Sequence, residues 1–267
     1  MDGLLKITQD KKRLLQQEES RKTSKWSYRS SNLTCGSVEK KFIDKNIKME
    51  NKDFQASELG TKEFWENTYK QEFTNFEDNG ETGDVWFGKK CQQNIIEWIK
   101  TCKEIKHTDA IVDLGTGNGF FLITLAEQGF SCLTGLDYSE NAVNFAKAVA
   151  KNKNINHITF EVADLLEKDC NAISLQKKYQ VCHDKGTFDA ISLMPGQFEH
   201  FKNAYVAAVG QILVDSGIFI ITSCNWTEKQ LLEHFKGDFH LKEVIPSPSF
   251  QFGGLSGSKY TTLVLIK

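Results

Sequence analysis

The stretch that decides the fold is a strand end running into a glycine-rich turn, Val112-Asp113-Leu114-Gly115-Thr116-Gly117-Asn118-Gly119. The apolar run before the turn, Ile111 to Leu114, is typical of a short buried strand. Apolar residues after the turn recur at helical spacing over 120–126. Glycine permits a tight turn and close approach of a ligand to the backbone, and the start of a helix offers unpaired N–H groups. This stretch therefore predicts a ligand-binding loop between a strand and a helix.

The acid at the start of the turn narrows the choice of ligand. A helix start after glycines suits pyrophosphate in dinucleotide-binding folds, but a carboxylate at the strand tip repels phosphate and attracts cations or hydrogen-bond donors. The spacing D-x-G-x-G-x-G resembles the cofactor loop of class I, seven-β-strand S-adenosylmethionine (SAM) methyltransferases. The resemblance implies SAM as cofactor, bound over Asp113, Gly115, Gly117 and Gly119. By its glycine spacing alone, the turn could equally hold a dinucleotide or a phosphate.

Composition divides the 267-residue chain into a polar tail and one sizeable domain. The first 60 residues hold 13 Lys or Arg and 9 Asp or Glu, with few apolar residues at any regular period. We therefore expect residues 1–57 to be disordered. We expect 58–267 to form the catalytic domain, with a helical cap over 58–108 and the core over 109–267. A helix capped by Thr61 and carrying Trp65 should open the cap.

The composition also argues against several classes of protein. A net charge of −2 gives no reason to expect direct nucleic-acid binding, and no apolar run approaches the ~20 residues that span a membrane. The seven cysteines form no C-x-x-C pair, which argues against structural zinc, and the histidine spacing predicts no metal site. We expect Cys132, Cys182 and Cys224 to be reduced core residues. A monomeric cytoplasmic protein is the expectation, with the nucleus as an open second location.

Strand and helix patterns alternate from residue 109 onward, which predicts a parallel α/β sheet. The strand patterns cover 110–114, 132–136, 158–162, 179–183, 217–222, 239–245 and 260–266. The last two lack an obvious helix between them, so we expect an antiparallel final pair. The prediction is a seven-stranded, mostly parallel, Rossmann-like sheet with an antiparallel last strand and helices on both faces. Five helical crossovers and a terminal hairpin would complete it.

Carboxylates follow the second and third strands, at the edge where ligands bind in open α/β sheets. Asp137 is expected to accept hydrogen bonds from a ribose diol, although it could instead cap the next helix. Asp164 is placed to accept a hydrogen bond from the adenine amine, with Leu165 as an apolar wall for the ring. Alternatively, Asp164 caps the next turn. Tyr138 could lie against the adenine edge or serve packing alone.

The run Asp184-Lys185-Gly186-Thr187-Phe188-Asp189 follows the fourth strand, where seven-strand enzymes hold the target atom. It lacks the N/D-P-P-Y/F motif of enzymes that methylate bases. A carboxylate there suits an aliphatic ammonium, so we assign Asp184 a catalytic role toward a lysine; the alternative is a cofactor contact or loop-shaping residue. Trp86 and Trp226 are the aromatic candidates for the same site. Trp86 could instead staple the N-terminal helices to the sheet, and Trp226 could pack the following helix.

Several stretches together resemble the eukaryotic translation elongation factor 1-alpha lysine N-methyltransferases, and within them the lysine methyltransferase 2 branch. The stretches are Glu58 to Thr61 with Trp65, Val85 to Gly88, Asp113 to Gly119, Asp184 to Ala190, Ser223 to Thr227 and Phe250 to Gly257. The resemblance implies a SAM-dependent protein-lysine N-methyltransferase whose protein substrate is elongation factor 1-alpha. The alternatives are a methyltransferase of another protein, RNA or a small molecule, and a non-catalytic SAM-binding protein.

Overall fold

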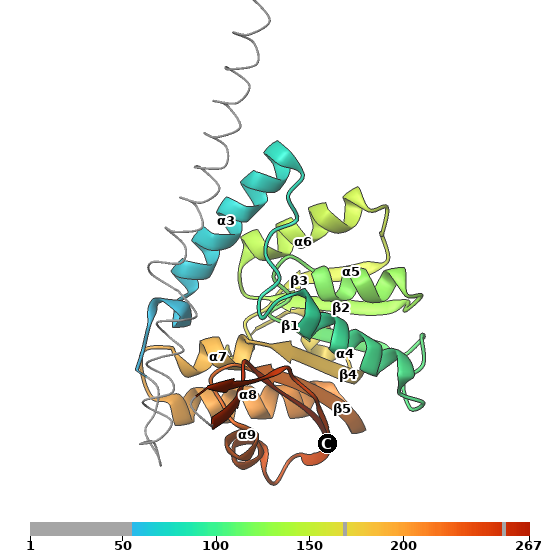
Figure 1. Cartoon of the computed structure of the whole chain (residues 1–267). Helices are drawn as coiled ribbons and strands as arrows, with labels where there is room; N and C mark the ends of the chain where they lie inside the picture. Colours follow the sequence, from blue (N-terminus) through green and yellow to red (C-terminus); the bar gives the residue numbers. More distant parts are fainter. Residues whose placement is uncertain (1–54, 168–169, 253–254) are drawn as a thin grey trace, which may run out of the picture. The chain divides into compact units, whose positions relative to one another are not determined.

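The computed structural model describes residues 55–167, 170–252 and 255–267, which lie within one compact unit (Figure 1). The expected tail over 1–57 lies almost entirely outside the described residues, so its disorder stays a prediction. The helices are η1 (Glu58–Gly60), α3 (Lys62–Asn79), α4 (Lys89–Thr101), α5 (Phe120–Glu127), α6 (Glu140–Asn152), η2 (Ile173–Gln176), α7 (Thr187–Ser192), α8 (Phe198–Ile212) and α9 (Glu228–Phe235). The strands are β1 (Ala110–Leu114), β2 (Cys132–Asp137), β3 (Ile158–Val162), β4 (Tyr179–Lys185), β5 (Leu213–Ser223), β6 (His240–Ile245), β7 (Ser249–Phe252), β8 (Leu255–Ser258) and β9 (Thr261–Ile266).

Seven of these strands form one sheet in the order β3-β2-β1-β4-β5-β9-β6. The pairs from β3 to β5 are parallel, whereas β9 runs antiparallel to both β5 and β6. The predicted sheet with its antiparallel last strand is therefore confirmed. The strand order reverses direction at the neighbouring pair β1 and β4, and ligands in open α/β sheets bind at such a point, beyond the carboxyl ends of the strands.

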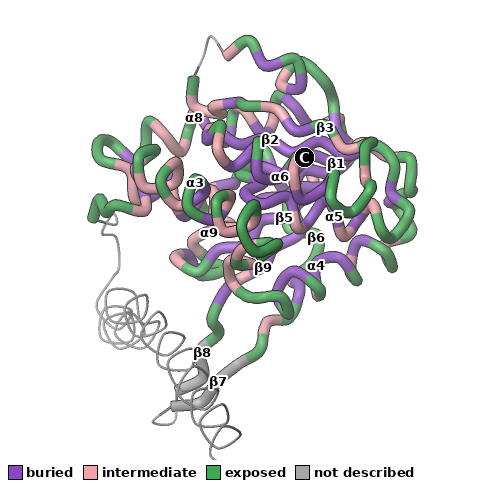
Figure 2. Tube along the Cα trace, turned by 90° about the horizontal axis from the view of Figure 1, so that it is seen from above, coloured by how far each residue is buried: buried purple, intermediate pink, exposed green. Residues whose placement is uncertain are grey.

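Helices cover both faces of the sheet because its central strands are apolar on both sides (Figure 1). Successive side chains alternate between faces. Ile111 packs with α4, α5 and α6, and its neighbour Val112 packs with α7, α8 and α9. On β5, Ile220 packs on the same face as Ile111, and Ile221 packs on the same face as Val112. Figure 2 shows the result, with buried stretches along the sheet strands and exposed ones on the outer sides of the helices.

The helix ends follow the capping chemistry in the sequence. The side chain of Thr61 accepts a hydrogen bond from the backbone N–H of Phe64 and starts α3 as expected. Thr227 and Gln230 form a capping box at the start of α9.

Three features differ from the expected pattern. The connection from β3 to β4 contains the short 3₁₀ helix η2 and no α-helix among its described residues, so the expectation of five helical crossovers was wrong there. Helix α7 has six residues, too few to show a helical period. The hairpin of β7 and β8 extends the last connection, and glycines in its sequence hide the strand alternation.

The cysteine prediction was right for Cys182 and wrong for two others. Cys182 is buried inside β4, but Cys132 and Cys224 are exposed. Cys132 opens β2 and Cys224 follows β5, so each lies at a strand end where the sheet is no longer covered.

Asp184 connects β4 to α7 beneath the sheet. Its side chain is fully buried and accepts hydrogen bonds from the backbone N–H groups of Thr187 and Phe188, each 3.0 Å away. The hydroxyl of Tyr205 on α8 donates to the same carboxyl group. Burial raises the pKa of Asp184 to about 7, against the lowering effect of these hydrogen bonds.

This burial predicts a pH-dependent stability. The pKa of Asp184 in the folded protein lies above its ordinary value of 3.8. At pH values between these two pKa values, the carboxyl group is protonated in the folded protein and ionised in the unfolded chain. The contribution of Asp184 to the free energy of unfolding must therefore fall as the pH rises through this window. Asp184→Asn should lack this fall, which amounts to roughly 1.4 kcal/mol for each pKa unit. Urea denaturation at pH 4.5 and 7.5 would measure it.

The matched control is Tyr205→Phe, which removes the hydroxyl but keeps the titrating carboxyl group. This variant should retain the fall in stability with rising pH. Equal pH dependence of wild type and Asp184→Asn would contradict the assignment.

Candidate functional site

The glycine turn after β1 is held in place by the tip of β2. The backbone N–H groups of Gly115 and Thr116 both donate to the carbonyl of Leu136, over 2.8 and 2.9 Å. The N–H of Gly117 donates to Asp137 over 3.0 Å. These bonds fix the path of the turn across the carboxyl ends of two neighbouring strands.

Two glycines of the turn could not be replaced without strain. Gly115 and Gly117 have φ values of +69° and +56°, which side chains disfavour. A Cβ atom on Gly115 would lie 2.0 Å from the hydroxyl oxygen of Thr187, and one on Gly117 would lie 2.6 Å from that of Tyr69. The turn therefore packs closely on α7 and α3, and its two glycines also line the space beside these helices.

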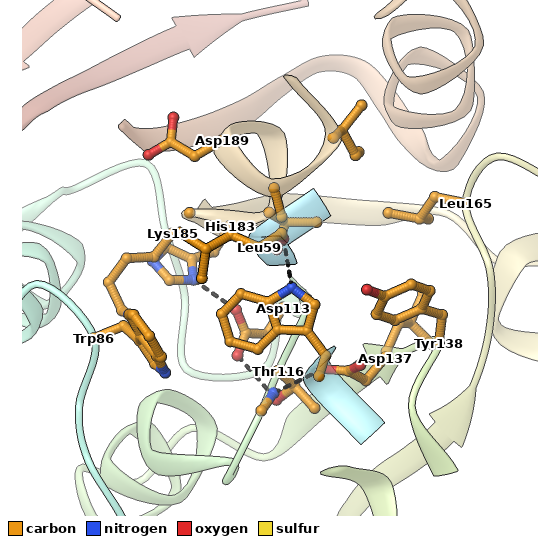
Figure 3. Close-up of a pocket in the computed structure, with 18 of the residues that line it drawn as sticks. Leu59, Trp86, Asp113, Thr116, Asp137, Tyr138, Leu165, His183, Lys185 and Asp189 are labelled. Carbon is orange, nitrogen blue, oxygen red and sulfur yellow. Dashed lines mark hydrogen bonds and ion pairs between the residues drawn. The ribbon is translucent and has the colours of Figure 1, made fainter. Parts of the chain in front are cut away.

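That space is a cavity of about 210 Å³ at the carboxyl ends of β1 and β4 (Figure 3). Eight predicted site residues line it: Trp86, Asp113, Gly115, Gly117, Asp137, Tyr138, Asp164 and Leu165. The structure thus brings together residues from four separate segments of the sequence. Of the three other predicted residues, Gly119 lies at the start of α5, where a Cβ atom would come within 3.0 Å of Ala146 and Phe160.

Asp113 forms the floor of the cavity together with a histidine that the sequence reasoning missed. One of its oxygens accepts from the hydroxyl of Thr116 at 2.9 Å, and the other lies 2.7 Å from Nδ1 of His183. The imidazole stacks on Phe121, with ring centroids 3.8 Å apart. Burial lowers the pKa of His183, although the neighbouring Asp113 acts to raise it. A neutral imidazole beside a carboxylate is the result.

Asp137, Tyr138 and Asp164 line another part of the cavity. Asp137 is buried, and its oxygens accept from the N–H groups of Gly117 and Ser139. Burial raises the pKa of Asp137 to about 6, against the lowering effect of these bonds. Asp164 accepts from the N–H of Leu166 at 2.9 Å, so it shapes its own turn as well as lining the cavity. Each carboxylate oxygen can accept a second hydrogen bond.

Segments before the core form the opposite side of the cavity. Asn118, inside the glycine turn, donates through its amide to the carbonyls of Thr82 and Asp84, at 2.9 and 3.2 Å. These bonds hold the loop that carries Trp86 beside the turn. The indole of Trp86 also packs edge-to-face on Trp65 of α3, with ring centroids 5.1 Å apart. Both readings of Trp86 are therefore compatible with the structure: it lines the cavity and it packs on an N-terminal helix.

Two predicted catalytic residues lie outside the cavity, which corrects their expected placement. The Asp184 carboxyl group is buried in the apolar layer below the sheet and holds the start of α7, as in the loop-shaping alternative. Trp226 is buried in the same layer, stacked on Phe198, which matches the packing alternative. Strand alternation explains the first error: β4 continues through Lys185, so Asp184 lies within the strand and faces away from the cavity.

The cavity contains further residues that the sequence reasoning did not single out as site residues. They are Gln92 on α4, His183 and Lys185 on β4, Asp189 on α7, and Asn225 after β5. Asp189 is buried and accepts from the hydroxyl of Ser223 and, at 2.8 Å, from the N–H of Cys224. The run D-K-G-T-F-D contains two carboxylates, and the second is the one that lines the cavity. Side chains alternate between the two faces of a strand. This alternation would have identified His183 and Lys185, the neighbours of Asp184 in β4, as the residues that face the cavity.

The described residues contain neither a candidate metal centre nor a candidate membrane span. Within the ranges that the structure covers, no group of three or more His, Cys, Asp and Glu side chains could hold a metal ion. No helix in those ranges combines the length and apolar character needed to cross a membrane.

Comparison with known proteins places this geometry in a family. A family model described as a methyltransferase domain matches residues 105–264. EEF1A lysine methyltransferase 2 of Danio rerio is 45% identical over 212 residues, which cover 79% of this chain and 89% of that protein. The protein of the same name from Homo sapiens is 40% identical over 214 residues, 80% of this chain and 89% of that one.

A solved structure supports the fold independently. The N-methyltransferase NodS from Bradyrhizobium japonicum WM9, in complex with S-adenosyl-l-homocysteine, aligns with a TM-score of 0.53 at 13% identity, over 76% of this chain and 97% of that chain. At this identity the likeness concerns the fold alone. The family model and the two relatives go further, because they match most of the chain in sequence. The chain belongs to the methyltransferase family that includes the EEF1A lysine methyltransferase 2 proteins.

Proposed function

We propose that this protein transfers a methyl group from SAM to the ε-amine of a lysine in translation elongation factor 1-alpha. The observation that carries the proposal is the 40–45% identity to relatives named for that reaction, over about four-fifths of the chain. The cavity supports it, because it combines a glycine turn, acids beyond three strands and an aromatic loop. The cytoplasmic location and the monomeric state stay predictions.

The residues of the cavity fit SAM. Gly115 and Gly117 line the cavity, where their backbone could lie under the amino acid portion of the cofactor. Asp137 keeps lone pairs for the ribose diol, and Asp164 keeps one for the adenine amine. Tyr138 and Leu165 supply flat and apolar surface for the ring beside Asp164.

The other side of the cavity suits the acceptor lysine. In Figure 3, Trp86 and Asp189 lie across the cavity from Tyr138 and Leu165. When bound, SAM supplies an electrophilic methyl group on a positively charged sulfur. The attacking lysine must be neutral, whereas its amine has a pKa of about 10.4 in water. Enclosure beside Trp86 lowers that pKa by disfavouring the cation.

We therefore assign Asp189, in place of Asp184, as the carboxylate that faces the acceptor. It would attract the lysine ammonium, orient its nitrogen and accept its proton. Burial raises the pKa of Asp189, which makes its carboxylate a better proton acceptor. Positioning of the two reactants contributes most to such a transfer, and this effect can supply ~7–11 kcal/mol.

The direct test is methyl transfer to elongation factor 1-alpha produced in bacteria. Incubation of the purified enzyme with isotopically labelled SAM should place label on a lysine peptide, identified by mass spectrometry. A parallel reaction in cell lysate, divided between protease and nuclease treatment, distinguishes a protein acceptor from RNA. Nuclease-sensitive label, or SAM binding without transfer to the elongation factor, would contradict the proposal.

The ribose contact makes a second prediction. Asp137→Ala should weaken SAM binding about 10- to 100-fold, because it removes a buried charged acceptor and the bond to Gly117. Affinity of the wild type should also fall as the pH drops through about 6, where Asp137 takes up a proton. Isothermal titration calorimetry measures both effects. Asp109→Ala, at the opposite end of β1, is the matched control, and normal affinity of Asp137→Ala would exclude the contact.

The acceptor assignment makes a third prediction. Asp189→Asn should reduce kcat about 100-fold, in the range of a lost acid–base group, and leave SAM affinity nearly unchanged. Asp184→Asn, assayed below its unfolding temperature, is the comparison because its carboxyl group lies outside the cavity. Normal turnover of Asp189→Asn, or a far larger loss in Asp184→Asn, would reverse the assignment.

A further inference from the structure

The cavity wall includes two hydrogen-bond donors that have no partner among the described residues. The side chain of Gln92 is 1% exposed, and its Nε2 atom has no acceptor there. The same holds for Nε1 of Trp86. Both residues line the cavity. A buried donor without an acceptor is unfavourable, so each of these atoms indicates a missing acceptor.

Lys185 adds a positive charge to this wall. Its Nζ atom lies 5.6 Å from the ring centroid of Phe87, and among the described residues its amine makes no salt bridge. Burial lowers the pKa of Lys185, although Asp113 and Cys91 act to raise it. Lys185 and Gln92 both line the cavity. A cation and buried N–H groups together are suited to an anion.

His183 supplies an acceptor next to these donors. The carboxylate oxygen of Asp113 can only accept, so Nδ1 of His183 carries the hydrogen between them. The Nε2 atom of the neutral ring is then a lone-pair acceptor, and it is buried without a partner among the described residues. Asp113 keeps further lone pairs of its own. Donors and acceptors therefore lie side by side, which is the pattern that an amino acid zwitterion requires.

We propose that Gln92 and Lys185 bind the α-carboxylate of SAM, and that His183 accepts from its α-ammonium group. The inference rests on the proposed use of SAM and adds to it how the methionine end is recognised. The zwitterion supplies the missing acceptor for the amide and the cation, and the missing donor for the imidazole. It also places a carboxylate beside Lys185, which offsets the cost of a partly buried cation.

The test compares three ligands that differ in single groups. S-adenosylhomocysteine carries both the carboxylate and the ammonium, S-adenosyl-3-thiopropylamine carries the ammonium alone, and 5′-methylthioadenosine carries neither. Lys185→Met should weaken binding of S-adenosylhomocysteine about 10- to 100-fold and leave the two other affinities nearly unchanged. Gln92→Leu should do the same with a loss of about 10-fold. His183→Phe should weaken the first two ligands and spare 5′-methylthioadenosine. Calorimetry gives every value without turnover.

Lys62→Met is the control, because it removes another lysine held over an aromatic ring, that of Tyr138 at 5.6 Å. It should not discriminate between S-adenosylhomocysteine and S-adenosyl-3-thiopropylamine. Equal losses for all three ligands in Lys185→Met and Gln92→Leu would show a structural role and overturn the carboxylate site. Failure of the wild type to bind S-adenosylhomocysteine would instead overturn the proposed function. Binding of 5′-methylthioadenosine verifies that each variant is folded.

Discussion

The site depends on the hydrogen bonds between the glycine turn after β1 and the tip of β2. Three consecutive backbone N–H groups, from Gly115 to Gly117, donate to Leu136 and Asp137. Because the two strands are parallel neighbours in register, these bonds bring the turn and the acid to the same edge. Gly115 and Gly117 have positive φ angles along this path, and a Cβ atom at either position would strike Thr187 or Tyr69. The three hydrogen bonds thus set both the shape of the turn and the position of Asp137.

The N-terminal segments complete the cavity through polar contacts with the core. Glu66 on α3 accepts hydrogen bonds from Ser139 and from the backbone and amide of Asn141, at the start of α6. A carboxylate is favourable there because it meets the unpaired N–H groups and the positive end of the helix dipole. Asn118 holds the loop of Trp86 by donating through its amide to two carbonyl groups of the preceding segment. The N-terminal segments are therefore attached near the starts of α5 and α6.

The sequence predicted the fold and the cavity residues that follow β1, β2 and β3 better than those on β4 and after β5. Strand periods and the D-x-G-x-G-x-G spacing are local signals, so β1, β3 and the position of Asp137 followed from them directly. The face on which a residue lies near a strand end depends on where the strand stops, which single-sequence patterns locate to within a few residues. The prediction ended β4 at His183 and so placed Asp184 beyond the strand. In the structure β4 ends at Lys185, so Asp184 lies within the strand and its side chain lies beneath the sheet. Trp226 was misplaced for a related reason, since the turn after Ser223 directs the indole onto α8 and α9.

The alternation of β4 has a consequence for the chemistry of the cavity. His183 and Lys185 face the cavity, while Asp184 between them faces α8, so one strand separates two polar networks by a single layer of backbone. The network below it, with Asp184 and Tyr205, fixes α7 and thereby Asp189. If α7 moved, the Asp189 carboxylate would move with it, while the bonds from the glycine turn to Leu136 and Asp137 would remain. The glycine turn and Asp189 are for this reason held in place by different parts of the sheet.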